Sequence, residues 1–504
     1  MSVFGARWRR LPTAAGPRGA RLQAISTAAL PRALVGVALS LTAAGVVADG
    51  ALQQTLLIIA GVAAAMIPVA AALARGRVEP FDVGVAVAFA YLVLFPLRAA
   101  VVLLGWDAAT NQRALMAGNP VVRDALVAVA LGLVAGGIGY AVPLGARLGA
   151  RVRFPSSPVA EQPSAVLAAV LFVFGTAAQS LILVASRNPD VPLIGGRGSG
   201  LVSSTSVLML VGLCLLARRA ALSRTRADCA WVATATLAGA AVGIIGQYKE
   251  VVLLSLLAPL VMAYFTTGRG IGLRWIALCG AIAVFVVFPL VTVWRQVSTT
   301  AGTENPIIVA SKLPGHYLDH DLLTGAERRL EITDLLTEPF ATTSHRLYGY
   351  DSMALVVRAT PSQIPYRLGA TMEGLWTGMV PRILWPDKPN IGIGFWFASH
   401  YWGTPPGVLE VPQTVTHPGE LYIDFGLPGV IVGMALLGLW YRFAYAALRP
   451  AESGTAAVLY TVLLLTVVSV DRDLPLVYVT LVQRMIVVAL LLTVLSWVAR
   501  LRSA

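Results

Sequence analysis

Residues 369–430 read GATMEGLWTGMVPRILWPDKPNIGIGFWFASHYWGTPPGVLEVPQTVTHPGELYIDFGLPGV, and they lie in the one long polar segment of a chain that otherwise consists of apolar runs. This segment decides the topology, because it separates a long series of apolar runs from a short one. It also concentrates the scarce ionisable side chains, namely Arg382, Lys388, His400, His417, Glu420 and Asp424. All five histidines of the chain fall between residues 316 and 417. The segment is therefore the first place to look for chemistry.

The composition is that of a membrane protein. Of the 504 residues, 57% are hydrophobic and only 12% are charged, with a mean hydropathy of +0.75. Charge this sparse cannot cover a soluble globule of this size. The net charge of +13 comes almost entirely from arginines that recur in short loops rather than on one face. Such a pattern indicates membrane topology more than nucleic-acid binding.

A membrane span needs about 20 apolar residues, and the sequence predicts twelve spans. They are bounded at 33–48, 53–74, 83–104, 121–145, 163–185, 201–217, 229–247, 250–267, 272–297, 427–448, 456–470 and 474–499. Arginines fall in every second loop, on the side of the basic N-terminus, and the positive-inside rule places that side in the cytoplasm. We therefore expect an all-α, polytopic inner-membrane protein with both termini cytoplasmic.

The expected domain organisation follows from these spans. A cytoplasmic N-terminus (1–32) leads into an uncleaved first span, nine spans cover 33–297, and three cover 427–499, before a cytoplasmic tail at 500–504. The large loop at 298–426, between the ninth and tenth spans, should then be extracytoplasmic. We expect it to be ordered, with short helices around 326–337 and 346–358, because it carries many tryptophans and tyrosines suited to the bundle surface or the lipid interface.

No known cofactor or metal motif is present. Cys214, Cys229 and Cys279 lie in or beside apolar runs without the spacing of a zinc site or a disulfide framework, which favours core thiols. Neither a phosphate-binding P-loop nor a GxSxG, HExxH or GxGxxG motif occurs in a suitable context. We expect no cofactor, and nothing in the sequence requires a metal.

Three arginines lie inside predicted spans, in the outer half of each helix. Arg98 follows Pro96 in the third span, Arg295 ends the ninth, and Arg484 lies well inside the last. A charge at such depth is costly unless it faces a polar cavity or a partner. One hypothesis is a shared outward-facing cationic site. The alternative is that each side chain separately snorkels to the interface.

Two further outer loops carry basic residues. Lys249 lies in the Gln247–Glu250 turn, and Arg197 lies in the glycine-rich loop 195–200. Glycines let backbone N–H groups approach an anion, and Arg197 could donate to a phosphate. An ordinary flexible turn remains an equal alternative for Arg197, as does an ion pair with Glu250 for Lys249.

Two motifs resemble those of the O-antigen polymerase family, the Wzy-type oligosaccharide repeat-unit polymerases. They are VPRILWPDKP (380–389) and THPGELYIDFGLPG (416–429), and the upstream stretches 344–361 and 367–382 are also similar to that family. The resemblance covers mainly residues 344–430. The family typically carries Gly-Glu-x-Tyr-x-Asn-Phe-Gly, and here Asp424 replaces the asparagine, whereas Glu420, Tyr422 and Phe425 are retained.

The resemblance implies that a glycan chain is moved from one polyprenyl pyrophosphate to a sugar hydroxyl of another lipid-linked repeat unit, on the outer leaflet. A leaving pyrophosphate requires dense positive charge, and an acceptor hydroxyl requires a base within hydrogen-bond reach. We expect Glu420 or His417 to be the base. The expected substrate-binding residues are Arg98, Arg197, Lys249, Arg295, Arg382, Lys388, Tyr422 and Arg484.

Each of these roles has a structural alternative. Glu420 could instead be an acid in the first turn of the tenth span that stabilises the helix, and His417 could be an ordinary packed loop residue. Arg382 and Lys388 could belong to a rigid proline-rich turn whose charges face water or headgroups. The expected partners are lipid-linked oligosaccharide and membrane lipids, with a chain-length regulator or a flippase as further candidates and no nucleic acid.

Two other functions compete with polymerisation. A ligase that delivers a finished glycan to another acceptor would share the cationic site and the base. A transporter or flippase for the lipid-linked glycan would instead be built from paired inverted halves with broken helices near the midplane. The single long loop late in this chain is asymmetric, which favours an enzyme.

Overall fold

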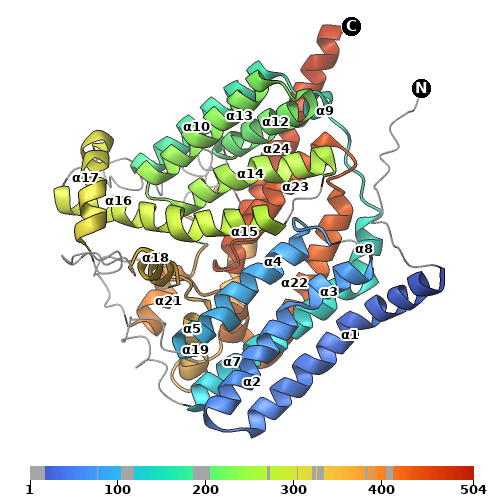
Figure 1. The fold of residues 1–504 in the computed structure, drawn as a ribbon, viewed down its shortest axis with the longest axis vertical. Helices are drawn as coiled ribbons and strands as arrows, with labels where there is room; N and C mark the ends of the chain where they lie inside the picture. The colour runs from blue at the N-terminus through green and yellow to red at the C-terminus, as the bar shows by residue number, and fades with distance from the viewer. Residues whose placement is uncertain are drawn as a thin grey trace.

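The computed structural model describes residues 17–76, 78–103, 119–185, 205–269, 273–302, 305–320, 325, 334–344, 346–380, 384–385, 387–389, 391–403 and 412–503. Within these residues the structure is all-helical, without strands (Figure 1). The first part of the chain forms α1 (Pro17–Val47), α2 (Gly50–Ala65), α3 (Ile67–Ala74), α4 (Val83–Leu92), η1 (Val93–Leu97), α5 (Arg98–Leu103), α7 (Asn119–Ala141), α8 (Pro143–Gly149), α9 (Pro158–Glu161), α10 (Ala165–Ala185), α12 (Val207–Ser223), α13 (Arg226–Ile245), α14 (Lys249–Thr267), α15 (Leu273–Ile282), η2 (Ala283–Val287) and α16 (Phe288–Ala301).

The long polar segment and the last spans follow. They form α17 (Pro306–Asp319), α18 (Asp334–Ser344), α19 (Gly349–Ala359), η3 (Ala370–Met372), α20 (Glu373–Thr377), α21 (Gly394–Tyr401), α22 (His417–Leu448), α23 (Gly454–Val467) and α24 (Leu474–Ser503). The helix expected around 346–358 is present as α19. Most of the one expected around 326–337 lies outside the described residues.

Ten helical segments in the described part of the chain are long and apolar enough to cross a membrane. Two shorter helices, α12 and α23, have 17 and 14 residues. A helix occupies or overlaps each of the twelve segments predicted from the sequence. The protein is therefore a multi-pass membrane protein by composition and helix length, and the count of twelve spans stays a prediction.

The bundle has two distinct ends. Helices α17, α18, α19 and α21 of the polar segment lie at one end, whereas the start of α1, the short helices α8 and α9, and the end of α24 lie at the opposite end (Figure 1). Basic residues such as Arg147 and Arg449 also belong to the second end. We call the first end the polar-segment end.

Helices α7 and α22 pack closely because glycines line their contact. A Cβ atom at Gly139 would lie 2.0 Å from the carbonyl oxygen of Ala435, and one at Gly438 would lie 1.9 Å from the carbonyl oxygen of Gly136. Small residues let helix backbones approach this closely in lipid, where packing rather than the hydrophobic effect drives association. This contact fixes the position of α22, which carries the candidate site.

Helix α22 begins at His417, whereas the sequence placed the start of the tenth span at residue 427. The helix is interrupted at Gly426, whose backbone has φ 65° and ψ −155°. Glycine suits this conformation because it lacks a Cβ atom. Residues 417–425 therefore form a short half-helix ahead of the membrane helix proper, and Glu420 and Asp424 are helical rather than part of a loop.

Candidate functional site

The half-helix 417–425 carries three polar residues on one face. His417, Glu420 and Asp424 are spaced three and four residues apart, and residues at this spacing lie one above another on a helix. All three are completely buried. The N-terminal residue before them, Thr416, accepts a hydrogen bond from the backbone N–H of Gly419 through its hydroxyl. The sequence therefore begins a helix here and turns its polar face into the protein.

Glu420 has two different oxygen environments. Its Oε2 atom accepts a hydrogen bond of 2.6 Å from the backbone N–H of Leu474, the first residue of α24. Its Oε1 atom is buried and receives no hydrogen bond from the described residues. Glu420 thus lies in the first turn of α22 and also caps the start of α24. Glu420 therefore has, in part, the helix-stabilising role considered from the sequence, and its Oε1 atom remains available to another partner.

His417 is oriented by a tyrosine from another helix. Its Nδ1 atom lies 2.8 Å from the hydroxyl of Tyr91, on α4. Its Nε2 atom is buried without a hydrogen bond from the described residues. Tyr478 of α24 packs against the opposite side of the ring. Because buried polar atoms are nearly always satisfied, Oε1 of Glu420 and Nε2 of His417 mark this place as a candidate site.

Two more acidic residues border Glu420. Asp424 accepts a 2.6 Å hydrogen bond from the hydroxyl of Thr371 in η3. Asp473, which directly precedes α24, is 6% exposed, and its Oδ2 atom has no hydrogen bond within the described residues. Burial raises the pKa of the Asp473 carboxyl, although backbone hydrogen bonds and the nearby Arg472 oppose this. The charges of both aspartates act on Glu420, so the three carboxyls form one acidic group.

Positive charge lies next to the acidic group, on α24 and in the turn before it. Arg484 donates a 2.9 Å hydrogen bond to the hydroxyl of Thr466. Arg472 pairs closely with Glu250 at the start of α14, and this carboxylate raises the pKa of Arg472. The charges of Glu250 and Arg472 also act on Arg484. Asp471 and Asp473 also act on Arg472, so three carboxylates offset its charge, whereas Arg484 has a hydroxyl partner and interacts with the charge of Glu250.

Arg98 does not belong to this cationic group. Its Nε and one terminal nitrogen lie 2.8 and 3.1 Å from the two carboxylate oxygens of Asp351 in α19, and its other terminal nitrogen lies 3.0 Å from the Ser344 hydroxyl. The side chains of Arg98 and Asp351 are fully buried. Arg98 is thus held by a buried carboxylate, and its expected role in substrate binding together with Arg484 stays a prediction. A carboxylate 253 residues away in sequence already neutralises it.

Lys249 and Arg295 form a separate group on α14 and α16. The Lys249 ammonium donates to the hydroxyl of Thr292 at 3.2 Å and lies 4.6 Å from the centre of the Phe288 ring. Arg295 is exposed and donates to the side-chain and backbone oxygens of Gln247 at 3.2 Å each. Lys249 therefore does not form the ion pair with Glu250 considered from the sequence, because Glu250 pairs with Arg472.

Lys388 has a structural partner set. Its ammonium donates to the backbone oxygens of Gly378 and Val380 at 3.2 and 2.7 Å, just after α20 ends. Carbonyl groups at the end of a helix have no partner within the helix, so Lys388 satisfies them. Tyr422 is half-buried on the half-helix, beside Tyr366. Arg197 and Arg382 lie outside the described residues.

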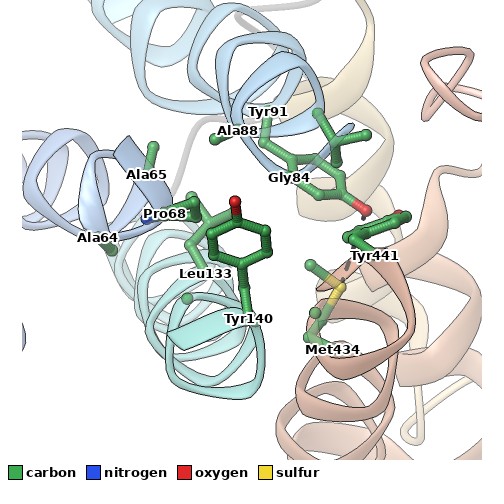
Figure 2. Close-up of a pocket in the computed structure, with 14 residues that line it drawn as sticks. Ala64, Ala65, Pro68, Gly84, Ala88, Tyr91, Leu133, Tyr140, Met434 and Tyr441 are labelled. Atoms are coloured by element: carbon green, nitrogen blue, oxygen red, sulfur yellow. Dashed lines mark hydrogen bonds between the residues drawn. The ribbon is translucent and has the colours of Figure 1, made fainter. Parts of the chain in front are cut away.

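A cavity lies below the half-helix, between α2, α3, α4, α7 and α22 (Figure 2). The space open to a water-sized sphere is about 30 Å³, and the lining consists mostly of small apolar residues. Tyr91 and Tyr441 line one part and Tyr140 another, and Figure 2 shows Tyr91 pointing its hydroxyl toward Tyr441. Since Tyr91 also contacts His417, the cavity and the polar site are contiguous.

Sequence reasoning missed four residues of this site, namely Tyr91, Thr371, Arg472 and Asp473. The sequence Asp471-Arg472-Asp473 offered a signal, because three charges between two apolar helices are unusual. Nothing local distinguished Tyr91 or Thr371, since each contacts the half-helix only after folding. No group of three or more His, Cys, Asp or Glu residues is placed to hold a metal ion in the part of the chain that was searched.

Comparisons with protein-family models, with curated proteins and with solved structures gave no match to this chain.

Proposed function

We propose that this protein polymerises polyprenyl-pyrophosphate-linked oligosaccharide repeat units at the outer face of the cytoplasmic membrane, with arginines binding the pyrophosphate. The main support for the proposal is that Glu420 and His417 lie in one buried site. Each presents an atom, Oε1 and Nε2, that has no partner among the described residues, and Nε2 carries a lone pair in the tautomer in which Nδ1–H donates to the Tyr91 hydroxyl. The polar-segment end would then face outward and the two chain termini would face the cytoplasm.

The proposed reaction begins at the acceptor sugar. Its hydroxyl gives its proton to Oε1 of Glu420 or to Nε2 of His417 while the hydroxyl oxygen forms a bond to the anomeric carbon of the donor glycan. The bond between that carbon and the pyrophosphate oxygen breaks, and its electron pair leaves with the polyprenyl pyrophosphate. General bases at hydrogen-bond distance contribute about 10²- to 10⁴-fold to such steps.

The leaving group would be stabilised chiefly by Arg484, because Glu250 pairs with Arg472. Guanidinium groups bind phosphate oxygens through two parallel N–H donors, and they retain their charge at any physiological pH. Their position beside the acidic group would place the pyrophosphate next to the base. Arg98 takes no part in this proposal because Asp351 neutralises it. Asp424, which replaces the asparagine of the resembling family, is held by Thr371 and would accept a hydrogen bond from a sugar hydroxyl.

The test is reconstitution of the purified chain into liposomes with a lipid-linked repeat unit, followed by gel analysis of chain length. We expect a ladder from the wild type, and a loss of at least about 100-fold in rate for Glu420→Gln, whose amide keeps the shape but is not a base. Arg123→Met is the matched control, because Arg123 is exposed and pairs only with the adjacent Asp124. Normal ladders from Glu420→Gln and His417→Asn together would refute the assignment.

The same assay separates polymerase from ligase. A second arm supplies a non-repeat glycolipid acceptor with the same donor. Transfer of one intact glycan to that acceptor, without a ladder in the first arm, would indicate ligation by the same site.

A further inference from the structure

We propose that His316 and His320, at the end of α17, bind a late first-row divalent metal ion such as Zn²⁺. This site is separate from the one described above and does not depend on the proposed function. The two histidines are four residues apart. His316 lies in the last turn of α17, and His320 follows as its C-terminal cap with an extended backbone, its N–H donating to the carbonyl oxygen of His316 at 3.1 Å. A four-residue spacing also separates two zinc ligands in metalloprotease sites, where both lie on one helix.

The two rings already lie together. Their centroids are 3.9 Å apart and their planes differ by 16°. Zinc–nitrogen bonds of about 2.0–2.1 Å place two nitrogens roughly 3.3 Å apart with both lone pairs directed at the ion. Because the lone pair of a ring nitrogen lies in the ring plane, the two rings would have to turn out of their parallel stack to bind one ion.

The hydrogen bond between His316 and Gln296 uses one ring nitrogen of the histidine and leaves the other available to a metal ion. Its Nε2 atom lies 3.3 Å from the side-chain oxygen of Gln296, on α16. An amide oxygen only accepts, so Nε2 carries the proton and Nδ1 keeps its lone pair. Metal-binding histidines usually donate their second ring N–H to an oxygen in this way. In addition, Nδ1 of His320 is buried and has no hydrogen-bond partner in the described residues.

A bound ion would join the last turn of α17 to α16 through Gln296. Two imidazoles would occupy two positions around the ion, and water would complete the coordination. Imidazole nitrogens suit Zn²⁺, Ni²⁺ and Cu²⁺ rather than Mg²⁺ or Ca²⁺, which prefer oxygen ligands. The site should therefore discriminate Zn²⁺ from Mg²⁺.

The test is calorimetric titration of the full chain, purified in detergent without a polyhistidine tag, with Zn²⁺ and separately with Mg²⁺. We expect one Zn²⁺ per chain and no Mg²⁺ binding. His316→Asn and His320→Asn should each weaken Zn²⁺ binding at least tenfold, and Gln296→Ala should weaken it less. His400→Asn is the matched control, because His400 stacks on Trp396 with no second imidazole beside it, and its affinity should equal that of the wild type.

A thermal unfolding measurement accompanies each variant. Zn²⁺ should raise the midpoint of the wild type and of His400→Asn, since a ligand that binds only the folded state stabilises it, and it should not raise that of His316→Asn. Unfolding midpoints without metal establish that the variants are folded. Zn²⁺ affinity of both histidine variants equal to that of the wild type, or no saturable binding to the wild type, would overturn the proposal.

Discussion

Replacing Arg98 by methionine should strongly destabilise the protein. The substitution keeps most of the volume but removes two hydrogen bonds to Asp351 and one to Ser344. Both side chains of the ion pair are 0% exposed, so the remaining carboxylate would lose Arg98 while staying buried. Breaking such a pair from one side costs about 3–5 kcal/mol, which corresponds to roughly 10²- to 10³-fold or more in the unfolding equilibrium.

A double-mutant cycle separates the ion pair from general packing. We expect Asp351→Leu alone to be about as harmful as Arg98→Met, and the double variant to recover most of the loss, because a well-packed apolar pair can replace a buried ion pair. Unfolding by SDS in mixed micelles, followed by tryptophan fluorescence, measures each variant. Arg123→Met, at an exposed pair, should change little. Equal stability of Arg98→Met and wild type would refute the neutralisation of Arg98 by Asp351.

Three other predictions use the same unfolding assay. Gly426→Ala should lower the free energy of unfolding by about 1–3 kcal/mol, since φ is 65° and the new Cβ would lie 2.8 Å from the Tyr366 hydroxyl. The control Gly280→Ala, whose Cβ would have nothing within 4 Å, should cost no stability. Equal losses from the two variants would contradict the break in α22. Lys388→Met should lose about 0.5–1.5 kcal/mol, because it removes the donor to the Val380 carbonyl while Gln483 still donates to that of Gly378, and an unchanged midpoint would contradict a structural role for Lys388. Burial raises the folded-state pKa of Asp473 above its ordinary 3.8. The protonated carboxyl therefore contributes its full stabilisation below pH 3.8, and this contribution is lost as pH rises through the raised pKa. Asp473→Asn should flatten this decline, and an identical pH slope in the variant would oppose the assignment.

The membrane helices could be predicted from the sequence because hydropathy and helix length are local properties. Each apolar run can be recognised as a helix from its own length and hydropathy, and helices lie at all twelve predicted segments. The start of α22 could not be placed this way. Its first residues, His417 to Phe425, are polar enough to resemble a loop, and they are helical because Asp424 and Glu420 find partners on η3 and α24.

The candidate site was predictable in part for the same reason. Glu420 and His417 are close in sequence, so their proximity follows from helical spacing. For Arg98, the cost of a buried charge is visible in the sequence, whereas the identity of its partner is not. Asp351 lies 253 residues further along the chain, in the polar segment, and only tertiary packing brings it to α5.

The ion pair between Arg98 and Asp351 has a consequence for how a large amphiphile would reach the interior. The ion pair connects α19 to α5, so the polar-segment end cannot move away from the bundle without breaking this ion pair. Entry by lateral diffusion from the surrounding bilayer requires no such rupture. If the chain is the proposed polymerase, whose two substrates are both lipid-linked, ladder formation in liposomes should slow in gel-phase lipid even at saturating substrate.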